Sequence, residues 1–349
     1  MEDNPVILVT AGYDHTIRMW DALKSTCTRT IPYTTESQIN RMALSSDKHY
    51  LAVAGNPSVS LYDVFGTSDL PVLKLDGHTA NVTAVEFTQD YKFLATCSED
   101  CTIRWWDVYA GVCKSELQNG SIVNDIAIHP DSRQELIVSC DQDGMIRAWS
   151  WRRREVLCEV APQPGVAVRS VTVSYDGQLV VAGNNLGQVF VYRLIIDTTP
   201  QGGRSVELEL YINFEAHDGY RITRTLFSNL IRYDEELFPN MKQSGEQLLV
   251  TCSSDRTAKL WRLTERKVPA ALGAREEVVQ AGAELVHSLN YHQRWVWDAA
   301  FSSDSGYLVT VSTDTRAALW STKTGQIIRE FKGHQKGIVC VALNDATNT

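Results

Sequence analysis

Short stretches of alternating hydrophobic and polar residues recur along the chain, separated by polar turns. The stretches 82–87 (VTAVEF) and 296–301 (VWDAAF) place apolar side chains at about every second position, and polar runs such as 302–306 (SSDSG) follow them. Alternation with a period of two is typical of β-strands whose two faces differ in burial. We therefore predict a protein built from many short strands joined by tight turns.

One local pattern recurs and sets the organisation of the chain. Five segments place an Asp six residues before a Trp, namely Asp14–Trp20, Asp100–Trp106, Asp143–Trp149, Asp255–Trp261 and Asp314–Trp320. Two weaker segments, Asn56–Tyr62 and Leu186–Tyr192, end in Tyr and lack the Asp. The aromatic residues at 20, 62, 106, 149, 192, 261 and 320 are spaced by 42, 44, 43, 43, 69 and 59 residues. Four nearly equal intervals of this length indicate a repeat architecture in which each unit supplies the same small sheet.

On these repeats the sequence resembles the WD-repeat family. The resemblance implies an all-β fold, a seven-bladed WD-repeat β-propeller that forms a single domain over residues 1–349. It also implies a hydrogen-bonded tetrad of His, Ser or Thr, Asp and Trp within a blade. Four sets match the tetrad: His78, Thr96, Asp100 and Trp106; His217, Thr251, Asp255 and Trp261; His292, Thr310, Asp314 and Trp320; and His334 with Thr10, Asp14 and Trp20.

The last of these sets joins the two ends of the chain. No His precedes Thr10 and Asp14, and no Asp follows His334, so the two half-sets together complete one blade. We therefore predict that the C-terminal strand 338–343 is the innermost strand of a blade whose other strands begin at Val6. Closure of this kind leaves no open sheet edge.

Three repeats depart from the tetrad. The units that contain Asn56 and Leu186 lack it, and the unit with Ser139 and Asp143 has Ser121 where the His would fall. We expect these three blades to be held by packing alone. In the first two, the Tyr in the Trp position keeps the hydrophobic area and a hydroxyl, so the fold should survive.

Two of the repeat intervals exceed the period, which predicts insertions near 195–209, 229–246 and 265–285. The first contains a turn-rich linker at 197–204, and the third is Ala-rich, which predicts a short helix or a loop. We expect these insertions to be tolerated surface elements rather than functional ones.

Composition and charge narrow the functions. Of the 349 residues, 44% are hydrophobic and 21% are charged, which is ordinary for a globular protein. The 33 basic and 42 acidic residues give a net charge of −9, which disfavours nucleic-acid binding, and no stretch is apolar for long enough to span a membrane. The eight Cys match neither a disulfide framework nor a zinc site, so we expect buried thiols, no metal and no other cofactor.

The recurring His, Ser or Thr, and Asp residues imitate a catalytic triad. Because the same grouping occurs in four blades, each time with a Trp, a structural role is favoured over an active site. The chain has no Gly-rich phosphate loop and no nucleophile elbow. We therefore predict no enzymatic activity and no small-molecule substrate, and rank a hydrolase as a distant alternative.

Candidate partner-binding residues lie at the starts of the innermost strands and just before the turn Asp, positions that the WD-repeat family exposes on one face. Trp295, Trp297 and Arg221 are the predicted anchors, because Trp and Arg dominate binding hot spots and neither Trp belongs to a blade motif. The other candidates are Tyr13, Asn81, Thr83, Glu99, Asn124, Arg169 and Thr223. The alternative is that the two Trp rings pack against the neighbouring blade.

A closer resemblance is to the family of small WD-repeat subunits shared by target-of-rapamycin kinase complexes. It is carried by residues 5–20 (PVILVTAGYDHTIRMW), 27–30 (CTRT), 129–138 (HPDSRQELIV), 294–302 (RWVWDAAFS) and 333–345 (GHQKGIVCVALND). The resemblance implies a non-catalytic scaffold that binds and stabilises the kinase domain of the catalytic subunit in complexes 1 and 2, in support of nutrient and growth signalling. It also implies a cytoplasmic location, extending through the complexes to vacuolar, lysosomal or plasma-membrane surfaces.

The alternative is a substrate receptor of a cullin ubiquitin ligase, or another adaptor. Such receptors usually carry Trp-Asp-x-Arg at the end of a blade. Residues 20–23 read WDAL and residues 106–109 read WDVY, so neither segment fits that pattern.

Overall fold

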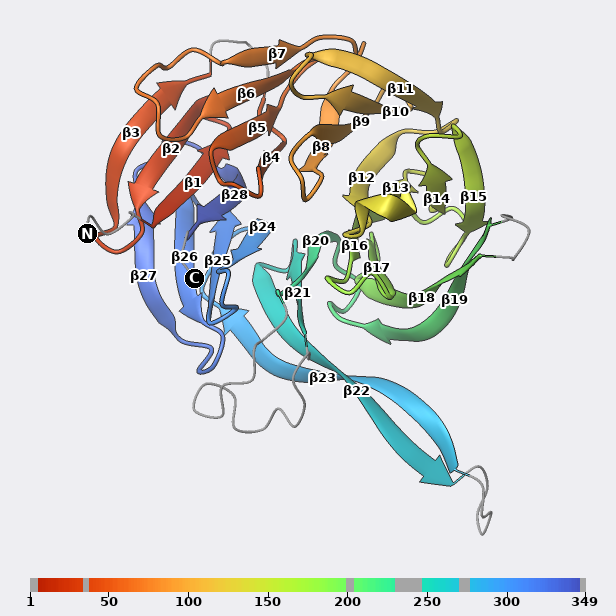
Figure 1. Cartoon of the computed structure of the whole chain (residues 1–349). Coiled ribbons are helices and arrows are strands. Elements are labelled where there is room, and N and C mark those ends of the chain that lie inside the picture. The colour runs from red at the N-terminus through yellow and green to blue at the C-terminus, as the bar shows by residue number, and fades with distance from the viewer. Residues whose placement is uncertain (1–5, 34–37, 199–203, 230–246, 270–276, 346–349) are drawn as a thin grey trace.

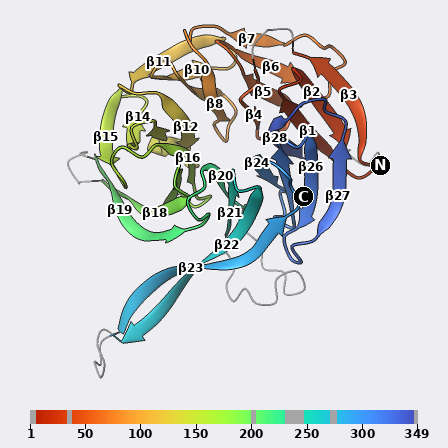
Figure 2. The same ribbon diagram turned by 180° about the vertical axis from the view of Figure 1, so that it is seen from behind.

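Seven four-stranded antiparallel sheets form a ring in the computed structural model of the chain, which describes residues 6–33, 38–198, 204–229, 247–269 and 277–345 (Figure 1, Figure 2). Each sheet is one blade, and its first strand lies nearest the central axis (Figure 1). The predicted seven-bladed propeller is therefore confirmed. Across these ranges no helix has the length and apolar character needed to cross a membrane.

The blades are numbered here in chain order, each written from its inner to its outer strand. Blade 1 comprises β4 (Arg41–Leu44), β5 (Tyr50–Ala54), β6 (Val59–Asp63) and β7 (Leu73–Leu75). Blade 2 comprises β8 (Val82–Phe87), β9 (Phe93–Ser98), β10 (Thr102–Asp107) and β11 (Val112–Gln118). Blade 3 comprises β12 (Val123–Ile128), β13 (Leu136–Asp141), β14 (Ile146–Ser150) and β15 (Glu155–Val160), with the 3₁₀ turn η1 (Ser132–Gln134) between its first two strands. Blade 4 comprises β16 (Val168–Val173), β17 (Leu179–Asn184), β18 (Gln188–Thr198) and β19 (Arg204–Glu215).

The remaining blades complete the ring. Blade 5 comprises β20 (Ile222–Phe227), β21 (Leu248–Ser253), β22 (Thr257–Pro269) and β23 (Glu277–Asn290). Blade 6 comprises β24 (Val296–Phe301), β25 (Tyr307–Ser312), β26 (Arg316–Ser321) and β27 (Ile327–Lys332). Blade 7 comprises β28 (Ile338–Asn344), β1 (Ile7–Gly12), β2 (Thr16–Asp21) and β3 (Thr26–Pro32).

Blade 7 closes the ring by pairing the two ends of the chain. Strand β28 runs antiparallel to β1, with Ile7 opposite Asn344 and Thr10 opposite Val341. Beyond the strand, Asp345 forms an ion pair with Lys48 of blade 1 at 2.7 Å. The predicted closure by the C-terminal strand is confirmed, and it makes the first and last residues of the described chain neighbours in one sheet.

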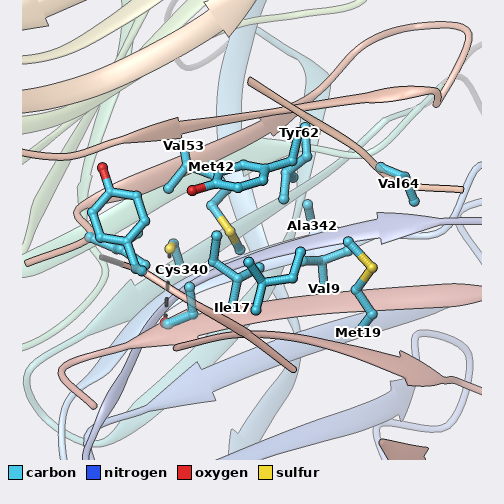
Figure 3. Packing of buried hydrophobic residues seen from close by; sticks show 14 of the residues in the cluster. Val9, Ile17, Met19, Met42, Val53, Tyr62, Val64, Cys340 and Ala342 are labelled. Carbon is cyan, nitrogen blue, oxygen red and sulfur yellow. Dashed lines mark hydrogen bonds between the residues drawn. The ribbon is translucent and has the colours of Figure 1, made fainter. Parts of the chain in front are cut away.

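The hydrophobic core lies between adjacent blades. In the cluster shown in Figure 3, Val9 and Ile17 of blade 7 face Met42, Val53 and Tyr62 of blade 1, and all five are buried. Similar clusters join the other blades, because both faces of an inner or middle strand are covered by a neighbour. Burial on both faces explains why strands such as β5 and β13 read as continuous apolar runs rather than as strict alternation.

The described parts of the insertions in blades 4 and 5 lengthen strands. Residues 195–198 and 204–209 lie in β18 and β19, and residues 265–269 and 277–285 lie in β22 and β23, which form a hairpin that extends well beyond the ring (Figure 1, Figure 2). The expected helix or loop is therefore wrong for residues 267–269 and 277–284, and residues 270–276 lie outside the described ranges. Residues 277–284 take the extended form because β22 supplies a backbone partner for each of them. Residues 230–246 lie outside the described ranges.

Loss of β28 is expected to destroy the propeller. A chain that stops before Gly337 would expose the inner edge of β1 and the buried faces of blades 1 and 6, so we expect insoluble or protease-sensitive protein. Limited proteolysis and thermal melting measure this. The matched control is a chain that stops after Asp345, which keeps the strand and should melt like the full chain. An unchanged melting temperature in the shorter chain would refute the closure argument.

Candidate protein-interaction face

Four blades carry the same chain of hydrogen bonds from Trp to Asp. In blade 2, Trp106 Nε1 donates to Thr96 Oγ1 at 2.9 Å, that hydroxyl lies 2.7 Å from His78 Nε2, and His78 Nδ1 lies 2.8 Å from Asp100 Oδ2. The sets in blades 5, 6 and 7 repeat these connections with distances of 2.6 to 3.0 Å. Each set ties the segment before the inner strand to the turn between the second and third strands. The turns on one face of the ring are thereby fixed, and we call these sets the clasps.

The protonation state of a clasp suits a structural link. Burial lowers the pKa of His78, so the ring is neutral at pH 7, with Nδ1–H donating to Asp100 and Nε2 accepting from Thr96. Burial by itself raises the pKa of Asp100, but hydrogen bonds from Thr102, the Thr79 backbone and His78 outweigh it and lower the pKa to about 2. An ionised carboxylate and a neutral imidazole therefore persist through the physiological range.

Two blades without the tetrad use other polar links. In blade 3 the buried Asp141 carboxylate accepts from Asn119 Nδ2 at 3.0 Å and pairs with Arg147 at 2.5 Å, whereas Asp143 is exposed. In blade 4 the Asn184 side chain accepts the N–H groups of Leu186 and Gln188. The expectation that these blades rely on packing alone is wrong. The repeat spacing singled out Asp143, but the acidic side chain two residues earlier points inward.

Nine of the ten predicted partner residues line one cavity where the central channel opens between the clasped turns. They are Tyr13, Asn81, Thr83, Glu99, Asn124, Arg169, Arg221, Thr223 and Trp297, and the cavity volume is about 260 Å³. Trp295 lies next to it, since its ring centroid is 5.5 Å from that of Trp297. We call this cavity and its rim the channel-mouth face.

A belt of hydrogen bonds joins the inner strands at this face. Asn40 Nδ2 donates to Val82 O at 2.7 Å, Thr83 Oγ1 to Val123 O at 2.6 Å, Asn124 Nδ2 to Val168 O at 2.8 Å and Thr223 Oγ1 to Val296 O at 2.5 Å. Each acceptor is the first residue of the next inner strand. Thr83, Asn124 and Thr223 therefore connect blades. The equivalent position holds Arg169 in blade 4, Trp297 in blade 6 and Val339 in blade 7, and there the belt is interrupted.

The two Trp rings differ in their surroundings. Trp295 is 42% exposed, whereas Trp297 packs against the core between blades 7 and 1 and donates from Nε1 to Thr313 Oγ1 at 2.7 Å. The interpretation that neither ring has a role in the fold is wrong for Trp297. For Trp295, the large exposed surface agrees with the interpretation that this ring has no role in the fold. Spacing alone could not separate the two, because both flank the same apolar residue, Val296.

Deeper in the channel lies a buried ion network that the sequence analysis missed. Arg41 of blade 1 lies 3.2 Å from Asp298 of blade 6 and 3.6 Å from Asp125 of blade 3. Arg224 of blade 5 contacts the same two carboxylates at 3.3 and 3.0 Å. The Asp125 carboxylate also accepts from Ser170 of blade 4. The available signal was the presence of charged residues inside otherwise apolar inner strands, which requires partners from other blades.

Glu86 of blade 2 borders this network. Burial raises its pKa to about 8, and the Asp125 carboxylate adds to the effect, whereas the Ile128 N–H at 3.0 Å and the cations Arg224 and Arg41 act against it. At pH 7 the side chain is therefore mostly protonated. Every blade thus sends a polar group toward the axis, with Val341 of blade 7 donating its N–H to Asp298.

The histidines of the clasps are engaged at both ring nitrogens, and within the ranges that the structure describes no three His, Cys, Asp or Glu side chains are placed to hold a metal ion. The arrangement offers a rigid rim, one exposed indole and two arginines beside a small cavity. Such a surface is suited to binding another protein.

Comparisons with known proteins agree with the repeat architecture. The family model of the WD domain, G-beta repeat, matches residues 2–21, 70–107, 111–150, 243–262 and 283–321. The chain is 42% identical to the target of rapamycin complex subunit wat1 of Schizosaccharomyces pombe, over 97% of this chain and 96% of that protein. It is 38% identical to the target of rapamycin complex subunit LST8 of Saccharomyces cerevisiae (97% and 99% covered) and 33% identical to that of Bos taurus (98% and 96% covered).

Removal of one clasp carboxylate is expected to destabilise the fold. Asp100→Ala leaves His78 and the turn N–H groups without their acceptor, so we expect a loss on the order of 1–3 kcal/mol in the free energy of unfolding. Urea denaturation measures it. Asp143→Ala is the matched control, because this residue has the same place in the repeat but is exposed, and it should change stability by less than about 0.5 kcal/mol. Equal stabilities for the two variants would disprove the structural role of the clasp.

The protonated state of Glu86 predicts a pH dependence. Its folded pKa, about 8, exceeds the ordinary 4.5, so the native state must take up a proton that the unfolded chain releases, and stability falls as pH rises from 4.5 to 8. Glu86→Gln removes this cost, so the variant should gain about 1–3 kcal/mol at pH 7 and nothing at pH 4. Denaturation curves at both pH values test this. Glu155→Gln, at an exposed site, should show no such difference between the two pH values.

Proposed function

This chain belongs to the WD-repeat family of target of rapamycin complex subunits, and on that premise we propose that it binds the catalytic subunit of such a complex through the channel-mouth face. Membership makes the chain a non-catalytic, scaffold-type subunit. The single observation that carries the choice of face is Trp295, a large side chain that stays 42% exposed at the rim of a polar cavity.

The surroundings of Trp295 favour binding at this place. The neighbouring ring of Trp297 is held by its hydrogen bond to Thr313. The exposed indole of Trp295 therefore lies against a ring that is fixed in position. The clasps hold the adjacent turns, and the belt holds the inner strands. A partner that docks here loses little conformational entropy on the side of the propeller, because the surface is already ordered.

We further propose that this contact stabilises the kinase domain in both complexes 1 and 2 and so supports nutrient and growth signalling. Support comes from the relatives in two yeasts and a mammal, which are subunits of target of rapamycin complexes. On this proposal the protein acts in the cytoplasm and reaches vacuolar, lysosomal or plasma-membrane surfaces as part of the complexes. Pull-down of complex-specific subunits with this chain as bait tests the pairing with each complex.

Trp295→Ala is expected to weaken binding to the catalytic subunit at least tenfold, because an interface Trp is commonly a hot spot. The fold should survive, since the ring is exposed and belongs to no clasp. Affinity measured with purified catalytic subunit, with circular dichroism and melting of the free variant, checks both statements. The matched control is Tyr109→Ala, which removes a 71% exposed ring from the turn between β10 and β11, at the opposite end of a blade. Undiminished affinity of a folded Trp295→Ala variant would place the partner on another surface.

A further inference from the structure

We infer that Arg169 and Arg221 form an anion seat on the channel-mouth face and that the seat takes a carboxylate side chain of the bound catalytic subunit. The inference rests on the proposed function, because it names the chemistry by which that same face recognises its partner. It goes beyond the assignment of a face, since it requires an acidic residue at the centre of the partner's binding surface.

The two arginines come from neighbouring blades and open into the same cavity. Arg169 is the second residue of β16, and Arg221 directly precedes β20, the adjacent inner strand. Arg169 is held by two amides, donating from Nε to Asn185 Oδ1 at 2.9 Å and from Nη1 to Asn124 Oδ1 at 3.0 Å. These contacts fix the guanidinium but leave its positive charge uncompensated, because both acceptors are neutral.

Arg169 also departs from the pattern of hydrogen bonds that bridges the inner strands of neighbouring blades. At the same position Asn40, Thr83, Asn124 and Thr223 donate to the first carbonyl of the next inner strand. Arg169 instead turns toward Asn124 and Asn185, away from the β20 backbone. The fold therefore gives up one link of the belt at this point, and the Arg169 side chain instead ties blade 4 back to Asn124 of blade 3.

The arginines of this channel fall into two classes. Arg41 and Arg224, deeper inside, each contact the two carboxylates Asp125 and Asp298. Arg169 and Arg221, by contrast, have no carboxylate within ion-pair distance anywhere in the part of the chain that is described. The acidic residue of the cavity lining, Glu99 of blade 2, accepts from Asn81 instead, at 3.3 Å.

Half-burial of two like charges side by side is unfavourable, and the pKa values of both guanidinium groups reflect this. Burial, followed by repulsion from Arg221, lowers the pKa of Arg169 to about 10, and burial also lowers the pKa of Arg221. Both stay protonated at pH 7, so the repulsion persists in the free protein. An anion placed between the two guanidinium groups relieves it and completes their hydrogen bonding.

A partner carboxylate fits the site better than a larger group. The cavity of about 260 Å³ has room for one side chain but not for a strand or helix, and the Trp pair at its rim supplies the apolar contact that surrounds such an anchor. The chain carries a net charge of −9, so a local pair of cations would also orient an acidic partner segment as it approaches.

The test compares charge-removing variants in a binding assay with purified catalytic subunit. Arg169→Gln combined with Arg221→Gln should weaken binding at least thirtyfold and flatten its dependence on salt. Lys336→Gln is the matched control, because it removes an exposed cation from the same face, and it should change affinity less than threefold. Arg169→Lys combined with Arg221→Lys keeps the charge without the planar fork, and should bind between the wild type and the Gln variant.

The outcomes separate this inference from the proposed function. If Trp295→Ala weakens binding and the folded Gln double variant binds like wild type, the anion seat is wrong and the face stands. If neither change affects binding, both ideas fail. If the Gln variant does not fold, the double Lys variant is measured in its place. Wild-type affinity of the Lys variant, with unchanged salt dependence, overturns the seat. A melting temperature raised by millimolar inorganic phosphate only when both arginines are present, with partner binding unaffected by their loss, would assign the seat to a free anion and overturn it.

Discussion

Antiparallel pairing of β28 with β1 is the constraint on which the rest of the structure depends. Each blade buries its inner and middle strands against two neighbours, and this is possible for all seven blades only when the ring is closed. Closure joins residues more than 330 positions apart, as with Ile7 and Asn344, so its entropic cost is high. The buried contacts of all the blades together offset this cost. The same closure brings the starts of all inner strands to one face. The proposed interaction surface is therefore a result of ring geometry before any special residue is considered.

Polar links then determine how firmly that surface is held. The clasps fix the turns at the outside of the face, the belt connects the strand starts, and the ion network of Arg41, Arg224, Asp125 and Asp298 holds the strands farther down the channel. Burying four charges is unfavourable unless every one is paired, and here each carboxylate meets both guanidinium groups. These contacts require partners from blades 1, 3, 5 and 6 at once. The network therefore specifies how the blades sit around the axis, in addition to any stability it adds.

The repeat architecture was predictable because its determinants are local. The Asp-to-Trp spacing, the His that precedes it and the unmatched half-sets at the two ends lie within about 40 residues of one another or at the termini, so they define blades and closure without three-dimensional information. Contacts between different blades were not predictable in this way. The spacing pointed to Asp143 although Asp141 makes the link in blade 3, and it treated Trp295 and Trp297 alike although only the second packs into the core. The β22–β23 hairpin was missed for a related reason, since residues 277–284 become a strand only beside a partner strand.

Comparison of equivalent positions around the ring shows where function can reside. At Asn40, just before β4, and at the second residue of three other inner strands, a donor bridges to the next blade, so four blades use this structural solution. Blades 4, 6 and 7 depart from it with Arg169, Trp297 and Val339. Two of these residues, Arg169 and Trp297, lie near Arg221 and Trp295 on the channel-mouth face. A closed ring tolerates the loss of single bridges because the remaining blade contacts hold each strand on both sides. Such tolerance frees these positions for side chains other than a bridging donor, and on the proposed function recognition is concentrated where the repeat departs from this pattern.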